Sequence, residues 1–216
     1  MTPIPVELRA QYRHRGARDH LRLLQRWYGT PFSEVEPWVP RVGTVVDVGC
    51  GFGLFAAILA LASPERRVVG LDLDAQKIAR GNAIFAGVPT MRLAVGTAED
   101  ALPPCDAVVF YDVLHHLRDT TVERALAAAY AALRPGGRII VKENDTAPRW
   151  KRAVAEVQET VAVFGGITKS DPWKFRDRDG WSSALASAGF RVQRADAIGC
   201  HSYGGLLPHS LFLGEK

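Results

Sequence analysis

The sequence has few cysteines and no long apolar run, and both absences narrow what the protein can be. Its three cysteines, Cys50, Cys105 and Cys200, are far apart and odd in number. They indicate reduced thiols rather than a disulfide framework, and their spacing is not that of zinc ligands. The longest apolar run, residues 54–62, is too short to cross a bilayer, and the N-terminus lacks the charged-then-apolar order of a secretion signal. We therefore expect a cytoplasmic protein without a membrane span or a metal site.

The composition is that of one globular domain. The chain has 216 residues, of which 47% are hydrophobic and 23% charged, which is enough for a single α/β domain with a full core. The net charge is +4, and much of it comes from arginines near the N-terminus: Arg9, Arg13, Arg15, Arg18, Arg22, Arg26 and Arg41. Acidic residues interrupt this run and no aromatic-basic interleaving follows. A solvated basic helix is thus expected, and nucleic acid is not the expected partner.

Apolar patterns predict strands that alternate with helices. The expected strands are residues 45–48, 68–71, 91–95, 107–111, 138–142, 190–198 and 210–213. The expected helices are residues 5–28, 54–62, 148–163 and 178–188. Two more are expected between these: one begins at Ala75 and is stopped by Gly87 and Pro89, and the other begins with capping-box spacing at 120–123 and ends at Pro135. Alternation through the first five strands favours a parallel sheet. Because no helix separates the last two strands, one of them is expected to be antiparallel.

A strand, a glycine-rich turn and a helix follow one another at residues 45–62. Gly49, Gly51 and Gly53 allow the backbone to approach a ligand closely, and the helix N-terminus favours a nucleotide-like ligand. The next strand ends in Asp72, 19 residues past Gly53, where a carboxylate can accept both hydroxyls of a ribose. A second acid, Asp47, lies inside the first strand, where burial is costly without a partner. The alternatives are a NAD site and a glycine turn that only ends the strand.

The segment Val46-Asp47-Val48-Gly49-Cys50-Gly51-Phe52-Gly53 resembles the first motif of the class I S-adenosylmethionine (SAM)-dependent methyltransferases, hydrophobic-Asp-hydrophobic-Gly-x-Gly-x-Gly. The resemblance covers about residues 42–214. It implies an α/β, Rossmann-like fold with a seven-stranded, mostly parallel sheet, helices on both faces and an antiparallel last strand. Residues 1–41 are then expected to form an N-terminal helical cap that belongs to the same structural unit as residues 42–216.

The resemblance also implies which residues bind SAM. The methionine part is expected at the loop Asp47, Gly49, Cys50, Gly51 and Gly53, and the ribose at Asp72. Leu73 should flank the adenine. The stretch Gly96-Thr97-Ala98-Glu99 is similar to the loop that faces the adenine in relatives, although Thr97 stands where an Asp is usual. The Ala98 amide or the Glu99 carboxylate would then hold the ring; the alternative is a plain surface loop.

The segment that ends the fourth strand borders the methyl group in the family. Asp112 lies there and is expected near the methionine end of SAM. The Asn/Asp-Pro-Pro-aromatic motif of methyltransferases that act on adenine or glutamine nitrogen is missing from this segment. An oxygen or carbon acceptor is therefore favoured.

Four further residues follow the fourth and fifth strands. His116 is expected to hold the turn through a backbone bond. His115 is a candidate general base, since its ordinary pKa lies near neutrality. Glu143 and Asp145 are candidates to orient an acceptor or to act as base, with a helix-capping role as the alternative. Aromatic side chains after the fifth strand suggest either a lid over a flat substrate or packing of a helical insertion: Trp150, Phe164, Trp173, Phe175 and Trp181.

These observations predict a SAM-dependent methyltransferase that acts on an oxygen or carbon of a small hydrophobic or aromatic metabolite. Two other functions stay open. The basic N-terminal segment suits an RNA methyltransferase, and an intact cofactor loop is also compatible with a SAM-binding partner protein that transfers no methyl group. The sequence does not indicate an oligomeric state.

Overall fold

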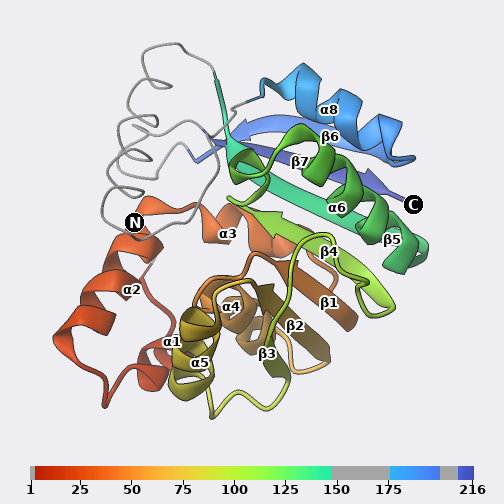
Figure 1. Ribbon diagram of the computed structural model, residues 1–216. Coiled ribbons are helices and arrows are strands. Elements are labelled where there is room, and N and C mark those ends of the chain that lie inside the picture. The colour runs from red at the N-terminus through yellow and green to blue at the C-terminus, as the bar shows by residue number, and fades with distance from the viewer. Residues whose placement is uncertain (1–2, 147–175, 200–208) are drawn as a thin grey trace.

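The computed structural model describes residues 3–146, 176–199 and 209–216 and contains one seven-stranded sheet in the order β3-β2-β1-β4-β5-β7-β6 (Figure 1). The strands are β1 Gly43–Val48, β2 Arg66–Asp72, β3 Met91–Val95, β4 Cys105–Tyr111, β5 Leu133–Asn144, β6 Arg191–Ile198 and β7 His209–Glu215. The first five strands pair in parallel, and β7 lies antiparallel to both β5 and β6. The predicted fold class is confirmed. The carboxyl ends of β1, β2 and β4 meet at one edge of the sheet, and ligands bind at that edge in open α/β sheets.

Helices cover both faces of this sheet (Figure 1). One face carries α1 Val6–Gln11, α2 Ala17–Gly29, α3 Phe32–Val35, α4 Leu54–Ala62 and α5 Ala75–Ile84. The other face carries α6 Asp119–Ala132 and α8 Arg178–Ser187. Two short 3₁₀ helices, η1 Glu36–Trp38 and η2 Leu114–His116, precede β1 and follow β4. The sheet thus separates two hydrophobic cores.

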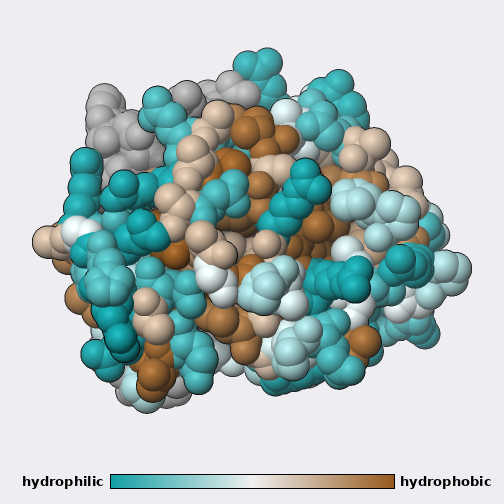
Figure 2. All heavy atoms as spheres, turned by 90° about the horizontal axis from the view of Figure 1, so that it is seen from below, coloured by the Kyte–Doolittle hydropathy of each residue, from teal (hydrophilic) through white to brown (hydrophobic). Residues whose placement is uncertain are grey.

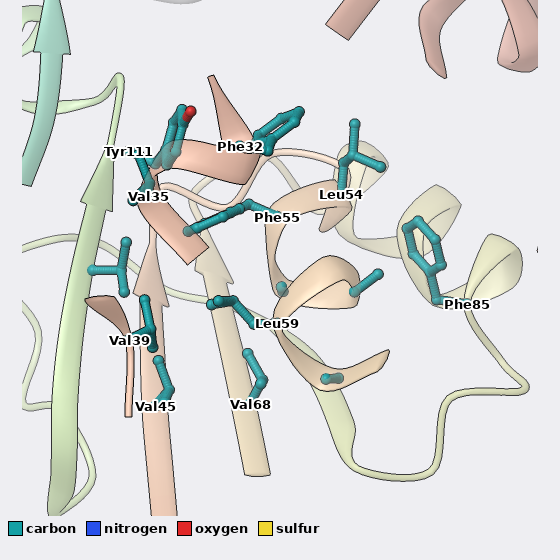
Figure 3. Close-up of a cluster of buried hydrophobic side chains, with 14 of the residues drawn as sticks. Phe32, Val35, Val39, Val45, Leu54, Phe55, Leu59, Val68, Phe85 and Tyr111 are labelled. Atoms are coloured by element: carbon teal, nitrogen blue, oxygen red, sulfur yellow. The ribbon is translucent and has the colours of Figure 1, made fainter. Parts of the chain in front are cut away.

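An aromatic cluster joins α3 to the centre of the sheet (Figure 3). The ring of Tyr111, the last residue of β4, lies 4.6 Å from the ring of Phe55 and 5.3 Å from that of Phe32, measured between centroids. Phe32 also stacks on Phe55 at 5.5 Å. Because contacts of this kind contribute beyond their buried area, they fix α3 over the carboxyl ends of β1 and β4.

Arg66, the first residue of β2, is fully buried and ties the segment before β1 to the sheet. Its guanidinium donates hydrogen bonds to the carbonyl oxygens of Val39, Pro40 and Leu59 at 2.7–2.8 Å and pairs with Glu36 at 3.0 Å. Burial lowers the pKa of Arg66, and Glu36 opposes that effect. The paired, hydrogen-bonded cation therefore anchors the chain as it leaves the N-terminal helices.

The expected single helix over residues 5–28 is wrong. The chain forms α1 and α2 with a break at residues 12–16, and Gly16 adopts an extended conformation as the N-cap of α2. Helical spacing in the sequence predicts that Leu21, Leu24 and Tyr28 form the buried apolar face of this helix. That prediction is also wrong, since Leu21 and Leu24 are 56% and 44% exposed. Instead α2 turns the face of Asp19, Leu23 and Trp27 towards the protein. Asp19 is buried because Arg80 of α5 pairs with it.

Other boundaries were predicted with mixed success. The sequence also predicts that Asp74 caps the helix that begins at Ala75. This is confirmed, since the Asp74 carboxylate accepts hydrogen bonds from the amides of Gln76 and Lys77. The capping box at 120–123 is wrong, because α6 begins at Asp119 with Arg118 as N-cap and without a side-chain cap bond. The strand β5 begins five residues earlier than expected. The predicted helix at 148–163 lies outside the described residues.

Within the described residues, no helix has both the length and the apolar character needed to cross a membrane. Large hydrophobic side chains that reach solvent are Val6, Leu21, Leu24, Trp38, Val42, Leu73 and Val95. On the face seen in Figure 2, hydrophobic residues lie among hydrophilic ones. Exposed apolar residues of this kind are ordinary for a protein surface.

Candidate active site

The glycine loop turns sharply from β1 into α4. Gly49, Gly51 and Gly53 all have positive φ, of 76°, 58° and 77°. A Cβ on Gly49 would overlap the Val113 side chain, whereas no described atom lies within 4 Å of the position of a Cβ on Gly51. The loop is therefore packed on one side by the segment after β4 and open above Gly51, where a ligand can approach the backbone.

Asp72 organises this loop from the end of β2. One carboxylate oxygen accepts the Gly51 amide at 2.8 Å, and the other accepts the Asp74 amide at 2.9 Å. Asp72 is half-buried, and each of its oxygens keeps lone-pair capacity for a further donor. Asp72, the residue predicted to bind the ribose, thus lies directly beside the glycine loop. Its contact with a ribose stays a prediction.

Asp47 lies at the base of the site and is 1% exposed. Neither of its carboxylate oxygens has a hydrogen-bond partner among the described residues. Burial and the charge of Asp72 raise the pKa of Asp47 to about 7, although the Ala56 amide and Arg26 act in the opposite direction. A buried acid without a partner suits a ligand that brings a positive charge, such as an ammonium group.

Cys50 lies in the same loop but is not an activated thiol. Burial, followed by the charges of Asp47 and Asp72, raises its pKa far above the ordinary value. Because the thiolate is the nucleophilic form, Cys50 can contribute its backbone and its volume to the site but not covalent chemistry.

The four predicted adenine contacts lie after β2 and β3, which are neighbouring strands. Leu73 is exposed, and Ala98 is half-buried against the second core. The Thr97 amide donates to the Asp100 carboxylate at 2.6 Å, and Glu99 pairs with Arg124 of α6 at 2.6 Å. The four residues therefore lie at the edge of the sheet where β2 and β3 end. Their contact with adenine stays a prediction.

Asp112 follows β4 with a left-handed backbone, φ 55°, which is unusual for a residue other than glycine. Its carboxylate pairs with Lys142 of β5, which is fully buried, and lies 4.0 Å from the Arg26 guanidinium of α2. Burial raises the pKa of Asp112, but Lys142 and Arg26 outweigh that effect and hold it below its ordinary value. Asp112 therefore stays ionised, and its strained backbone is held in place by tertiary contacts.

Glu143 of β5 holds the segment that follows β4 through hydrogen bonds to its backbone. The carboxylate is fully buried and accepts the amides of Val113 at 3.2 Å and Leu114 at 2.7 Å through one oxygen. The other oxygen bonds Nδ1 of His115, which is also buried. The ring of His115 lies against that of His116, with centroids 3.9 Å apart. Glu143 thus holds both the backbone of η2 and the orientation of His115.

Asp145 is separate from this arrangement. Its carboxylate accepts a hydrogen bond from Ser210 of β7 at 2.7 Å and lies 3.3 Å from the Arg178 guanidinium of α8. It therefore fastens the end of β5 to its neighbours. Of the predicted acceptor-side residues, the structure brings His115 and Glu143 into contact but gives Asp145 different partners.

Two strand residues in the site were not found from the sequence, Lys142 and Tyr111. Lys142 could have been found from the sequence, because it directly follows the apolar strand residues Ile139-Ile140-Val141. A lysine buried in such a strand requires a partner of opposite charge. Trp181, one of the suggested lid residues, belongs to the core between α8 and the sheet. The other suggested lid residues lie outside the described part of the chain.

Comparison with known proteins identifies the fold and the domain. Residues 45–137 match the methyltransferase domain family. An uncharacterized methyltransferase of Mycobacterium tuberculosis is 39% identical over 99 residues, 45% of this chain and 48% of that protein. The ubiquinone biosynthesis O-methyltransferase of Idiomarina loihiensis is 38% identical over 132 residues, 58% of this chain and 51% of that protein. The chain thus spans about half the length of these relatives.

A solved structure extends the likeness to the whole fold. Human N-acetylserotonin methyltransferase in complex with SAM superimposes with a TM-score of 0.69 at 20% identity, and the match covers all of this chain and 60% of that one. The buried, partnerless carboxylate of Asp47 and the open space above Gly51 fit the methionine part of SAM. Residues 45–137 thus match the methyltransferase domain family, and the chain shares the fold of this solved methyltransferase.

Proposed function

We propose that this protein transfers the methyl group of SAM to an oxygen or carbon atom of a small hydrophobic or aromatic molecule. The observation that carries the proposal is the position of His115 on Glu143, directly after Asp112 at the cofactor edge of the sheet. The relatives support a small acceptor, since one is a ubiquinone biosynthesis O-methyltransferase. They do not decide it, because another relative is a ribosomal RNA large subunit methyltransferase.

SAM, when bound, supplies an electrophilic methyl group on a sulfonium. Asp47 receives the ammonium of the methionine part, and Asp72 receives the ribose hydroxyls. The pair of Asp112 and Lys142 fixes the segment that closes over the loop through Val113. These groups orient the cofactor and keep water from its reactive end, which are the main contributions that a methyl transfer requires.

His115 is the proposed base, and Glu143 is the residue that orients it. With a proton on Nδ1, the imidazole donates to Glu143 and carries its lone pair on Nε2. That nitrogen can take the proton of an acceptor hydroxyl or enol as the oxygen or carbon attacks the methyl carbon. The methyl–sulfur bond breaks as the new bond forms, and S-adenosylhomocysteine (SAH) leaves.

The experiment that tests this proposal follows labelled methyl groups. Purified protein is incubated with methyl-labelled SAM and either the small-molecule fraction or the RNA fraction of a bacterial extract. We expect label in an organic-soluble small molecule and binding to bulk tRNA that is weak at every salt concentration. Label in RNA, with tRNA affinity that falls steeply as salt rises, would instead establish an RNA methyltransferase. SAM binding with no label in either fraction would indicate a partner protein that transfers no methyl group.

A further inference from the structure

The positive charge of the protein is concentrated in α1 and α2. Residues 3–28, which contain both helices, carry six arginines against Glu7 and Asp19, a net charge of +4. The whole chain has the same net charge, so basic and acidic residues balance over the rest of the sequence. Asp19 is buried and paired with Arg22 and Arg80, whereas Glu7 is exposed. The surface of these two helices therefore attracts anions.

The same two helices expose apolar side chains. Val6 of α1 is 75% exposed, and Leu21 and Leu24 of α2 also reach solvent. Leu21 and Leu24 are three residues apart and thus share one side of α2, away from the side on which Leu23 enters the core. Apolar residues scattered singly over a surface are ordinary, but these three lie on neighbouring helices at the outer edge of the molecule (Figure 1).

A hollow of about 420 Å³ lies between α1 and α2. Val6 and Leu24 line it, and Arg9 and Arg13 belong to the same lining. Both of these arginines and Arg18 of α2 are exposed, and none of the three has an ion-pair partner among the described residues. Apolar side chains and uncompensated cations therefore occur side by side on this surface.

This combination fits the surface of an anionic lipid bilayer. A helix that lies in a bilayer interface buries its apolar side chains at the boundary of the acyl chains, while basic side chains interact with the anionic headgroups. RNA would also attract the arginines, but its bases stack on aromatic rings. The large hydrophobic side chains exposed on α1 and α2 are aliphatic, so a bilayer uses them and RNA does not.

We propose that α1 and α2 dock this protein on anionic lipid bilayers. The three exposed apolar side chains enter the interface, and the three unpaired arginines pair with lipid phosphates. Docking requires neither a cofactor nor an acceptor, so the inference goes beyond the proposed function. A bilayer at α2 is also close to the site, because the Arg22 guanidinium carbon lies 4.2 Å from the centre of the Phe52 ring in the glycine loop.

The test is sedimentation of the full chain with lipid vesicles. Vesicles of phosphatidylglycerol and phosphatidylcholine in equal parts should bind the protein, and vesicles of phosphatidylcholine alone should bind it at least about 10-fold more weakly. Binding should fall as salt rises, because counter-ions screen exposed charges.

Two sets of variants separate the contributions of charge and apolar surface. Arg9→Gln, Arg13→Gln and Arg18→Gln together should weaken vesicle binding about 100-fold, since each arginine near an anionic surface contributes about a factor of five. Leu21→Ser with Leu24→Ser should weaken it about 10-fold, because apolar burial in the interface is lost. Both sets should keep the melting temperature of the wild type, because these side chains are exposed.

Matched controls change the same chemistry elsewhere. Arg67→Gln, Arg92→Gln and Arg138→Gln together remove three exposed arginines from β2, β3 and β5, and Val42→Ser removes an exposed apolar side chain before β1. Both controls should bind vesicles within about 3-fold of the wild type, because charges more than a Debye length from the lipid are screened.

Equal losses in the helix variants and the controls would overturn the inference, and so would equal binding to both kinds of vesicle. Binding of bulk tRNA in place of vesicles, lost with the three arginines, would assign the surface to RNA and overturn it. A dimer in solution that Leu21→Ser with Leu24→Ser dissociates, without vesicle binding, would assign the surface to a second copy of the chain and also overturn it. SAH binding by a wild-type protein that does not bind vesicles would overturn this inference alone and leave the proposed function intact.

Discussion

Replacing Asp72 with alanine should weaken SAH binding about 10- to 100-fold, or about 1.5–3 kcal/mol, the value of hydrogen bonds to a charged group. Two losses combine in this variant. The ribose hydroxyls lose their predicted acceptor, and the Gly51 amide loses the oxygen that holds it at 2.8 Å. The glycine loop, which is predicted to bind the methionine part, therefore also loses a hydrogen bond that holds its backbone. Calorimetry with SAH measures the effect, and circular dichroism should show the fold retained.

Asp74→Ala is the control for this prediction. It removes the same charge two residues later, and with it the N-cap of α5, but it leaves both carboxylate oxygens of Asp72 in place. Loss of a cap costs about 1 kcal/mol of folding free energy, so a modest fall in melting temperature with unchanged SAH affinity is expected. Equal SAH affinities in the wild type and a folded Asp72→Ala variant would show that Asp72 does not contribute to cofactor binding.

His115→Ala should lower kcat about 100-fold or more while SAH affinity changes little. The size of the effect is that of a lost general base. The small effect on SAH is expected because the contacts of His115 within the described residues include Glu143 and His116, which lie in β5 and after β4. The measurement requires the acceptor found by the labelling experiment. It compares kcat with SAH affinity, and thereby separates the methyl-transfer step from cofactor binding.

Two companion variants distinguish orientation from proton transfer. Glu143→Gln replaces an oxygen that faces Nδ1 of His115, so kcat should fall with that of His115→Ala. Asp145→Asn should keep near-wild-type kcat, because among the described residues Asp145 pairs with Ser210 and Arg178. Near-wild-type turnover in all three variants would exclude a base and leave orientation alone as the mechanism. A large loss of SAH affinity in His115→Ala would assign that residue to the cofactor.

Local sequence patterns were sufficient to predict the glycine loop and the strand that ends in Asp72. Val45–Val48, the glycine turn and the helix from Leu54 are adjacent in the chain, so their order alone defines the loop. The Asp74 cap and the strand that ends in Asp72 depend on neighbours within three residues. The parallel sheet followed from the alternation of strands and helices, since short crossovers permit few other arrangements.

Contacts between distant segments were not predictable in this way. Glu143 bonds residues 28–30 positions earlier, and Lys142 pairs with Asp112 across two neighbouring strands. Such pairs are set by strand register, which periodicity does not reveal. The buried face of α2 was misassigned for a similar reason: Arg80 of α5 makes burial of Asp19 favourable, and the preference of leucine for the interior is overridden at Leu21.

The most direct test of the central claim is calorimetry of the wild-type protein with SAH and with NAD at neutral pH. The site has a partnerless acid below the glycine loop, for the ammonium of an amino acid, and a carboxylate beside the loop, for a ribose. It should therefore bind SAH with micromolar affinity and give no heat with NAD. Micromolar binding of NAD without binding of SAH would contradict the account.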